Sequence, residues 1–113
     1  APVEVWGSGN SIRQFLYVED LVKIIKLFIQ NDIENCIINI SNGQKVSIRE
    51  LVENISSIFK FSGDIIYDSS KPEGASVRLM DNSKMKNTIT YDSFDMINEG
   101  LKKTIDWFIS TEK

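Results

Sequence analysis

The sequence contains no histidine and a single cysteine, which excludes several kinds of functional site. Without histidine there is no Ser-His-Asp or Cys-His triad, and one cysteine allows neither an internal disulfide nor the usual His and Cys ligands of zinc. No signal peptide or bilayer-length apolar run is found, and 13 basic against 16 acidic residues include no basic cluster. We expect a cytoplasmic protein with no metal, no membrane partner and no nucleic-acid partner.

Strands and helices are predicted to alternate along the chain. Apolar residues at alternate positions predict strands over residues 2–6, 36–41 and 65–67, and extended segments over 15–18 and 78–80. Helical spacing predicts helices over 19–30, 48–59 and 96–110, with a short helical turn over 83–86. Ser47 and Glu50 have the spacing of a capping box. The fold class is therefore α/β, one domain over residues 1–113 in which short strands alternate with three main helices.

The helix predicted over residues 19–30 is unusually apolar. Only Lys23, Lys26 and Gln30 form a polar stripe, so we expect the helix to be buried on most sides. A domain of this size has few faces with which to cover such a helix, so a partner surface is implied. Cys36 precedes two isoleucines and is predicted to be a buried thiol at a strand edge.

The stretch over residues 5–20 places one indole and one guanidinium on either side of a glycine turn. Trp6 precedes Gly7 and Gly9, and Arg13 follows them. An aromatic face packs against a ribose or a base, and an arginine fork is preorganised for phosphate oxygens. Taken singly, Trp6 is more often a core residue and Arg13 more often a solvated charge. Together they indicate a candidate site for a nucleoside diphosphate.

Several motifs resemble, in order and spacing, the carboxyl-terminal part of one enzyme family. They are Trp6-Gly-x-Gly-x-x-x-Arg13-x-Phe-x-Tyr-Val-x-Asp20, residues 39–43 followed by 46–51, Ile66 to Lys71-Pro72-Glu73-Gly74, and Gly100-Leu101-x-x-Thr104-x-x-Trp107-Phe108. The chain resembles the NAD(P)-dependent nucleotide-sugar epimerases and reductases of the extended short-chain dehydrogenase superfamily, and among them the GDP-L-fucose synthases. The resemblance implies the substrate-binding portion of that fold, without its cofactor-binding Rossmann part.

The cofactor-binding and catalytic motifs of that family are not found in this sequence. Gly7 and Gly9 lack the third glycine and the helix start of a dinucleotide fingerprint, so NADP or NAD is expected only in a full-length parent. Tyr67 and Lys71 have the family's Tyr-x-x-x-Lys spacing, but Tyr67 ends a strand pattern and a proline follows Lys71, whereas the catalytic pair needs a helix. No catalytic residue is predicted. The short length and the start at Ala1 predict an inactive fragment or isolated domain.

Five residues are predicted to bind substrate: Trp6, Arg13 and Glu73 from the resemblance, and Lys71 and Arg78 from their position. Trp6 and Arg13 occupy the positions that contact the GDP-sugar in GDP-L-fucose synthase-like enzymes. Glu73 stands where the family has an aspartate, and its carboxylate reaches one methylene further toward a guanine edge or a ribose hydroxyl. Lys71 and Arg78 flank that loop and either add charge near the diphosphate or are plain solvated side chains.

Three hypotheses for function follow from these features. The first is the nucleotide-sugar-binding portion of a GDP-L-fucose synthase-like enzyme, and the second is the same portion of an epimerase or dehydratase acting on a UDP-, dTDP- or CDP-sugar. The third is a non-catalytic α/β module that binds protein through the apolar helix over residues 19–30. In the first two, a missing amino-terminal cofactor domain is the expected partner of that helix. A second copy of the chain is the alternative, through self-association.

Overall fold

The structure is a computed structural model, and it describes residues 1–112 as four helices and four short strands. The strands are β1 (Val3–Trp6), β2 (Ile12–Arg13), β3 (Val46–Ser47) and β4 (Ile65–Asp68). The helices are α1 (Val18–Gln30), α2 (Ile48–Phe59), α3 (Ser83–Thr88) and α4 (Ile97–Thr111). The predicted α/β class with three main helices is confirmed. No helix within residues 1–112 has the length and hydropathy needed to cross a membrane.

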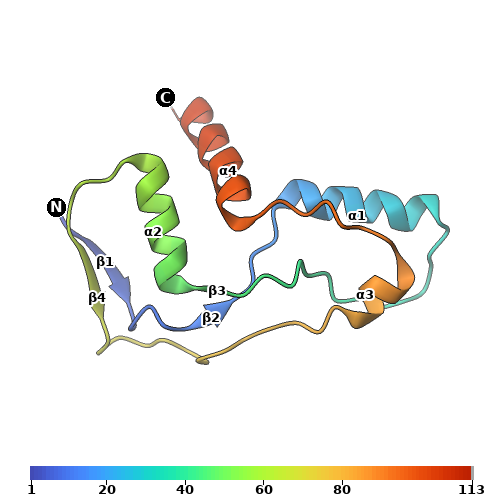
Figure 1. Ribbon diagram of the computed structural model, residues 1–113, viewed down its shortest axis with the longest axis horizontal. Coiled ribbons are helices and arrows are strands. Elements are labelled where there is room, and N and C mark those ends of the chain that lie inside the picture. Colours follow the sequence, from blue (N-terminus) through green and yellow to red (C-terminus); the bar gives the residue numbers. More distant parts are fainter. Residues whose placement is uncertain (113) are drawn as a thin grey trace.

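The strands form two separate pairs at different places in an elongated molecule of 51 × 35 × 20 Å. The β1 and β4 strands are parallel, with Val3 opposite Ile65 and Trp6 opposite Asp68, and they lie at the end of the molecule far from α1 and α3 (Figure 1). The β2 and β3 strands are antiparallel. Because β1 and β4 end at the same level, the segments that follow them start at the same edge.

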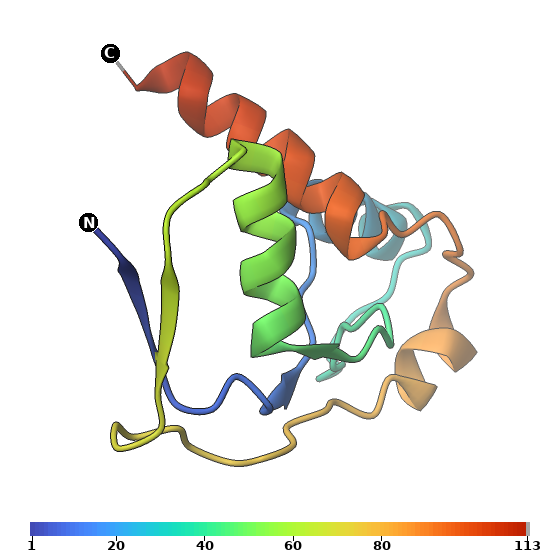
Figure 2. The same ribbon diagram turned by 60° about the vertical axis from the view of Figure 1, so that its left-hand side comes forward.

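The capping box predicted for α2 is formed. The Ser47 hydroxyl accepts a hydrogen bond from the Glu50 amide at 3.0 Å, and the Ser47 amide donates to the Glu50 carboxylate at 2.9 Å. The helix packs beside the β1–β4 pair and against α4 (Figure 2). The strands predicted over residues 2–6 and 65–67 and the helical turn predicted over 83–86 are also confirmed, as β1, β4 and α3.

The strand predicted over residues 36–41 does not form. Ile38 and Ile40 pack against the core of Ile24, Met85 and Ile89, so the alternating pattern has the predicted inward face. A strand also needs a neighbour for its backbone hydrogen bonds, and none pairs with this segment within residues 1–112. The prediction of a buried strand-edge thiol is wrong as well, because Cys36 is exposed.

The prediction that the first helix is buried on most sides is wrong. Only Asp20 and Ile24 are buried on α1. The exposed stripe is Val18, Val22, Ile25 and Ile29, which are 45–70% exposed. These four residues recur at helical spacing on one face, and the chain packs against another face, so the exposed stripe has no cover within residues 1–112.

The start of α1 is joined to the segment before α4 by a buried carboxylate. Asp20 is 1% exposed and accepts hydrogen bonds from the Tyr91 hydroxyl at 2.6 Å and from the Asp95 amide at 3.1 Å. Burial, followed by the hydrogen bond to Asp20, raises the pKa of Tyr91 to about 12. The Asp95 side chain in turn forms an ion pair with Lys103 of α4 at 2.6 Å.

Candidate functional site

Two loops meet at the edge where β1 and β4 end. The glycine loop (residues 7–11) follows β1, and the 69–76 loop follows β4. The Gly7 amide donates to the Asp68 carbonyl at 2.8 Å, which extends the strand pairing by one residue. The Ile12 amide then donates to the Ser76 carbonyl at 2.8 Å, so the far ends of the two loops are also joined.

Glu73 fastens the 69–76 loop to the glycine loop. Its Oε1 accepts hydrogen bonds from the hydroxyls of Ser8 at 2.6 Å and of Ser11 at 3.1 Å. The side chain lies so close to Gly7 that a Cβ there would come within 2.9 Å of Glu73 Cγ. The Ser8 hydroxyl is the main cause that lowers the pKa of the Glu73 carboxyl, and Ser11 and the charge of Arg13 act in the same direction.

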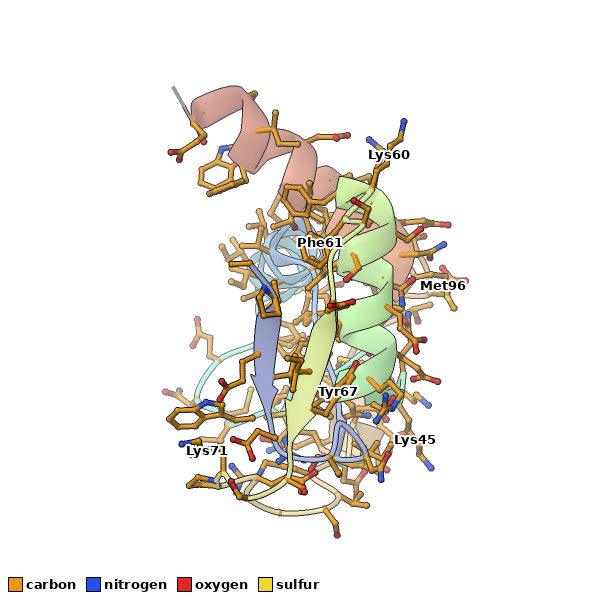
Figure 3. The ribbon with its side chains drawn as sticks, turned by 90° about the vertical axis from the view of Figure 1, so that its left-hand side faces the viewer. Lys45, Lys60, Phe61, Tyr67, Lys71 and Met96 are labelled. Carbon is orange, nitrogen blue, oxygen red and sulfur yellow. The ribbon has the colours of Figure 1, made fainter. Side chains whose placement is uncertain are left out.

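Trp6 is not a core residue, although its type alone favours that role. Its side chain is 60% exposed at the end of β1. The Lys71 ammonium lies 5.5 Å from the centre of its ring, within the range of a cation–π contact. Lys71 projects from the turn after β4, at the end of the strand pair opposite Phe61 (Figure 3). An aromatic face and a positive charge are therefore presented together to solvent.

Arg13 and Arg78 lie near the second half of the 69–76 loop. Arg13 Nη1 donates to the Ile12 carbonyl at 2.8 Å, and a Cβ on Gly74 would lie 3.5 Å from Arg13 Nη2, so the guanidinium lies beside the residue after Glu73. The Arg78 amide donates to the Ile12 carbonyl at 3.0 Å, which brings Arg78 next to β2, with its side chain exposed.

The structure thus brings four of the five predicted residues to one edge. Lys71 lies against Trp6, and Arg13 lies beside Gly74, the residue after Glu73, while Arg78 is held next to β2. The exposed indole, the two cations and the carboxylate are groups that can contact a base, a diphosphate and a hydroxyl. These groups are suited to binding a nucleoside diphosphate.

The Tyr67 and Lys71 pair does not have the helical arrangement of a catalytic Tyr-x-x-x-Lys. Tyr67 lies in β4, and Lys71 lies in the turn that follows, where its amide donates to the Asp68 carbonyl at 3.2 Å. Tyr67 instead contacts Arg49 of α2, whose guanidinium carbon lies 3.9 Å from the centre of the tyrosine ring. This contact was missed at the level of sequence, where Arg49 is only one polar residue in a capped helix.

The residues that the structure describes form neither a dinucleotide fingerprint nor a cluster of metal ligands. After Gly7 and Gly9 the chain enters β2, where a dinucleotide fingerprint needs a helix. The first amides of α2 are already used, because Ile48 donates to the Ser11 carbonyl at 3.0 Å and Arg49 to the Gly9 carbonyl at 2.9 Å. No group of three or more His, Cys, Asp or Glu side chains within residues 1–112 is arranged to hold a metal ion.

Comparison with known proteins supports the resemblance seen in the motifs. The profile of the NAD dependent epimerase/dehydratase family matches residues 1–41. The chain is 34% identical over 109 residues to Probable GDP-L-fucose synthase 1 of Oryza sativa subsp. japonica, and 30% identical over 119 residues to GDP-L-fucose synthase of Escherichia coli (strain K12). It covers 96% and 97% of itself in these matches but 33% and 37% of the relatives. The chain therefore spans about a third of the length of the curated relatives it matches.

Solved structures give the same result. A GDP-L-fucose synthetase from Naegleria fowleri bound to NADP matches 97% of this chain and 35% of its own, with a TM-score of 0.85 and 25% identity. A UDP-N-acetylglucosamine 4-epimerase from Methanobrevibacter ruminantium M1 in complex with UDP-N-acetylmuramic acid matches 98% of this chain and 36% of its own, with a TM-score of 0.81 and 29% identity. The predicted resemblance to GDP-L-fucose synthase-like nucleotide-sugar epimerases and reductases is confirmed, with a length consistent with their carboxyl-terminal portion.

Proposed function

We propose that this chain is the GDP-sugar-binding portion of a GDP-L-fucose synthase-like epimerase and reductase. One observation carries the proposal: residues from three separate segments converge where β1 and β4 end. They are Trp6, Arg13, Lys71 and Glu73. The hydrogen bonds between the glycine loop and the 69–76 loop hold these side chains together at one edge.

Each residue has a distinct part in the proposed complex. Arg13 contacts the diphosphate through its fork, and Lys71 and Arg78 add positive charge near it. The exposed face of Trp6 packs against the ribose or base. Glu73 uses its Oε1 to hold the glycine loop, through the hydroxyls of Ser8 and Ser11. In the proposed complex the same carboxylate accepts from a base edge or a ribose hydroxyl through its Oε2.

The reaction itself belongs, in this proposal, to a longer cytoplasmic protein. An amino-terminal domain would bind NADP, supply the hydride and carry the proton-transfer residues, and its surface would cover the exposed stripe of α1. The Naegleria fowleri relative was solved bound to NADP, whereas residues 1–112 of this chain contain no dinucleotide fingerprint. Residues 1–113 would then be one substrate-binding domain that consumes no NADPH by itself.

A UDP-sugar is the second candidate ligand. The epimerase from Methanobrevibacter ruminantium M1 matches this chain with a TM-score of 0.81, and its title names a UDP-sugar complex. Glu73 in the family's aspartate position also changes the reach toward the base. The fold is therefore compatible with either nucleotide, and binding measurements are needed to distinguish GDP from UDP.

Titration of the chain with GDP, UDP and dTDP by calorimetry tests the proposal. Tighter binding of GDP supports a GDP-L-fucose synthase-like enzyme, and tighter binding of UDP or dTDP supports another nucleotide-sugar enzyme. Binding of none of the three contradicts both and leaves the protein-interaction module. NADPH consumption with a GDP-4-keto sugar by this chain alone contradicts the assignment of the reaction to another domain.

A further inference from the structure

Arg49 joins three parts of the molecule that are far apart in the sequence. From the first turn of α2 its Nη2 donates to the Ser8 carbonyl in the glycine loop at 2.8 Å. Its guanidinium carbon also lies 3.9 Å from the centre of the Tyr67 ring in β4, which is a stacking distance. Figure 3 shows Tyr67 between the strand pair and the first turns of α2. One side chain therefore contacts both the loop and the strand that lies behind it.

The backbone at the start of α2 holds the same loop. A helix leaves its first amides without internal partners, and here two of them donate to glycine-loop carbonyls. The Ile48 amide bonds to Ser11 at 3.0 Å and the Arg49 amide to Gly9 at 2.9 Å. With the side-chain bond to Ser8, three donors of α2 fix three carbonyls of a five-residue loop.

The glycine loop packs closely on Tyr67 at Gly9. Gly9 is buried, with φ at +81°, and a Cβ there would lie 2.7 Å from Tyr67 Cε1 and 3.3 Å from Arg49 Cβ. Gly9 is thus enclosed by the two residues that stack on each other. The position of the Tyr67 ring, and hence of Gly9, depends on the guanidinium above it.

We propose that Arg49 is a positioning residue that holds the glycine loop and so sets the spacing of Trp6 and Arg13 for a nucleoside diphosphate. The loop connects β1, which ends at Trp6, to β2, which contains Arg13, and its path decides how far apart the indole and the guanidinium stand. This role rests on the proposed function, because Arg49 acts only through residues assigned there to the ligand. Arg49 itself touches no ligand in this account.

Variants at Arg49 test the role with two separate measurements. The variants are R49A, which removes the bond and the stack, and R49K, which keeps the charge without the planar group. The matched control is K23A on α1, which also removes one positive charge and which makes no hydrogen bond or ion pair within residues 1–112. The measurements are the NMR chemical shift of the Gly9 Hα protons, which lie against the Tyr67 ring, and the Kd for GDP.

We expect R49A to move the Gly9 Hα shifts toward their values in an unstructured chain and to weaken GDP binding about tenfold, the effect of one charge-assisted hydrogen bond. R49K is expected to lie between R49A and the wild type, and K23A to match the wild type in both. Unchanged Gly9 shifts and an unchanged Kd in a folded R49A protein overturn the proposal. If R49A does not fold, R49K decides, and wild-type values for it overturn the proposal equally.

The two measurements separate this inference from the proposed function. If the wild type binds none of GDP, UDP and dTDP, the proposed function fails, and the ligand part of this inference fails with it. The Gly9 shifts of R49A still decide whether Arg49 holds the loop. If the wild type binds GDP and R49A binds it equally well, the proposed function stands and the positioning role is wrong.

Discussion

The Ser8 hydroxyl donates a 2.6 Å hydrogen bond to Glu73, a residue 65 positions later in the chain. The buried Ser11 hydroxyl donates to the same carboxylate oxygen at 3.1 Å. The predicted base-contacting residue is therefore also an internal clamp between two loops. This double use makes the shape of the candidate site depend on the ionisation of one carboxyl group.

The clamp is expected to open at low pH. Because hydrogen bonds from the two serines lower the pKa of Glu73 below its ordinary value of 4.5, the ionised form is favoured in the folded protein. Its contribution is fully present above pH 4.5 and is lost as the pH falls through the lowered value. We expect the amide signals of Ser8 and Ser11 to titrate with a midpoint below 4.5.

The variant E73Q is expected to lack this titration step, because an amide oxygen can still accept from the serines but does not ionise. E53Q is the matched control, since Glu53 is exposed on α2 and makes no hydrogen bond or ion pair within residues 1–112. A midpoint at or above 4.5 in the wild type, or the same step in E73Q, contradicts the clamp.

Two glycines allow steric contact to be separated from backbone strain. Gly9 and Gly43 have nearly the same φ, +81° and +77°, but a Cβ on Gly9 would lie 2.7 Å from Tyr67, whereas on Gly43 the nearest atom is 3.6 Å away. Alanine in either place costs about 1–2 kcal/mol of left-handed strain. G9A is expected to lose about 1–3 kcal/mol more than G43A in urea unfolding, through overpacking. Equal losses contradict the close packing of Gly9 on Tyr67.

Local features of this fold were readable from the sequence. The β1 strand and the three main helices follow from the spacing of apolar residues, and the capping box of α2 from two residues three positions apart. Each of these depends on neighbours along the chain. The prediction of a strand over residues 36–41 is wrong because a strand depends on a distant partner. The apolar pattern is present, but no second strand within residues 1–112 lies beside this segment.

The residues of the candidate site were proposed from the sequence, but the hydrogen bonds and contacts that hold them were not. Trp6 and Arg13 were found from their types around a glycine turn, and Glu73 from the family resemblance. The hydrogen bond between Ser8 and Glu73 was not predicted, because no local rule relates positions 65 residues apart. Arg49 was missed because the capping pattern fixes where α2 begins and says nothing about where its second side chain reaches.

The buried carboxylate of Asp20 makes a strong prediction for stability. Y91F removes the hydroxyl that donates to it at 2.6 Å and is expected to lower the free energy of unfolding by about 1–3 kcal/mol. Y67F is the control, since the Tyr67 hydroxyl makes no hydrogen bond within residues 1–112. Urea unfolding at neutral pH measures both, and equal stabilities of the two variants contradict the assigned role of Asp20.

The same contact predicts a dependence on alkaline pH. The pKa of Tyr91 is raised from 10.0 to about 12, so the stabilising protonated form is fully present below pH 10 and is lost as the pH rises toward 12. The free energy of unfolding of the wild type is expected to fall over this range by more than that of Y91F. Parallel curves for the two proteins contradict the raised pKa.

The exposed stripe of α1 predicts self-association of the isolated chain. Its four aliphatic residues are 45–70% exposed, and hydration of apolar surface is unfavourable by about 25 cal/mol per Å². Sedimentation over a concentration series is expected to show association that I25E in the stripe weakens. K23E is the control, on the polar side of the same helix. A monomer at all concentrations, without binding of an apolar dye, contradicts the exposure of the stripe.

Mapping the GDP contact by NMR tests the central claim most directly. On addition of GDP to the ¹⁵N-labelled chain, we predict the largest shifts at the Trp6 indole N–H, the Arg13 side chain, the glycine loop and residues 71–74. R13K keeps the charge but loses the bidentate fork, so its affinity is expected to fall by on the order of 1–3 kcal/mol. Shifts confined to residues outside this edge, or an R13K protein that binds GDP as tightly as the wild type does, contradict the proposed site.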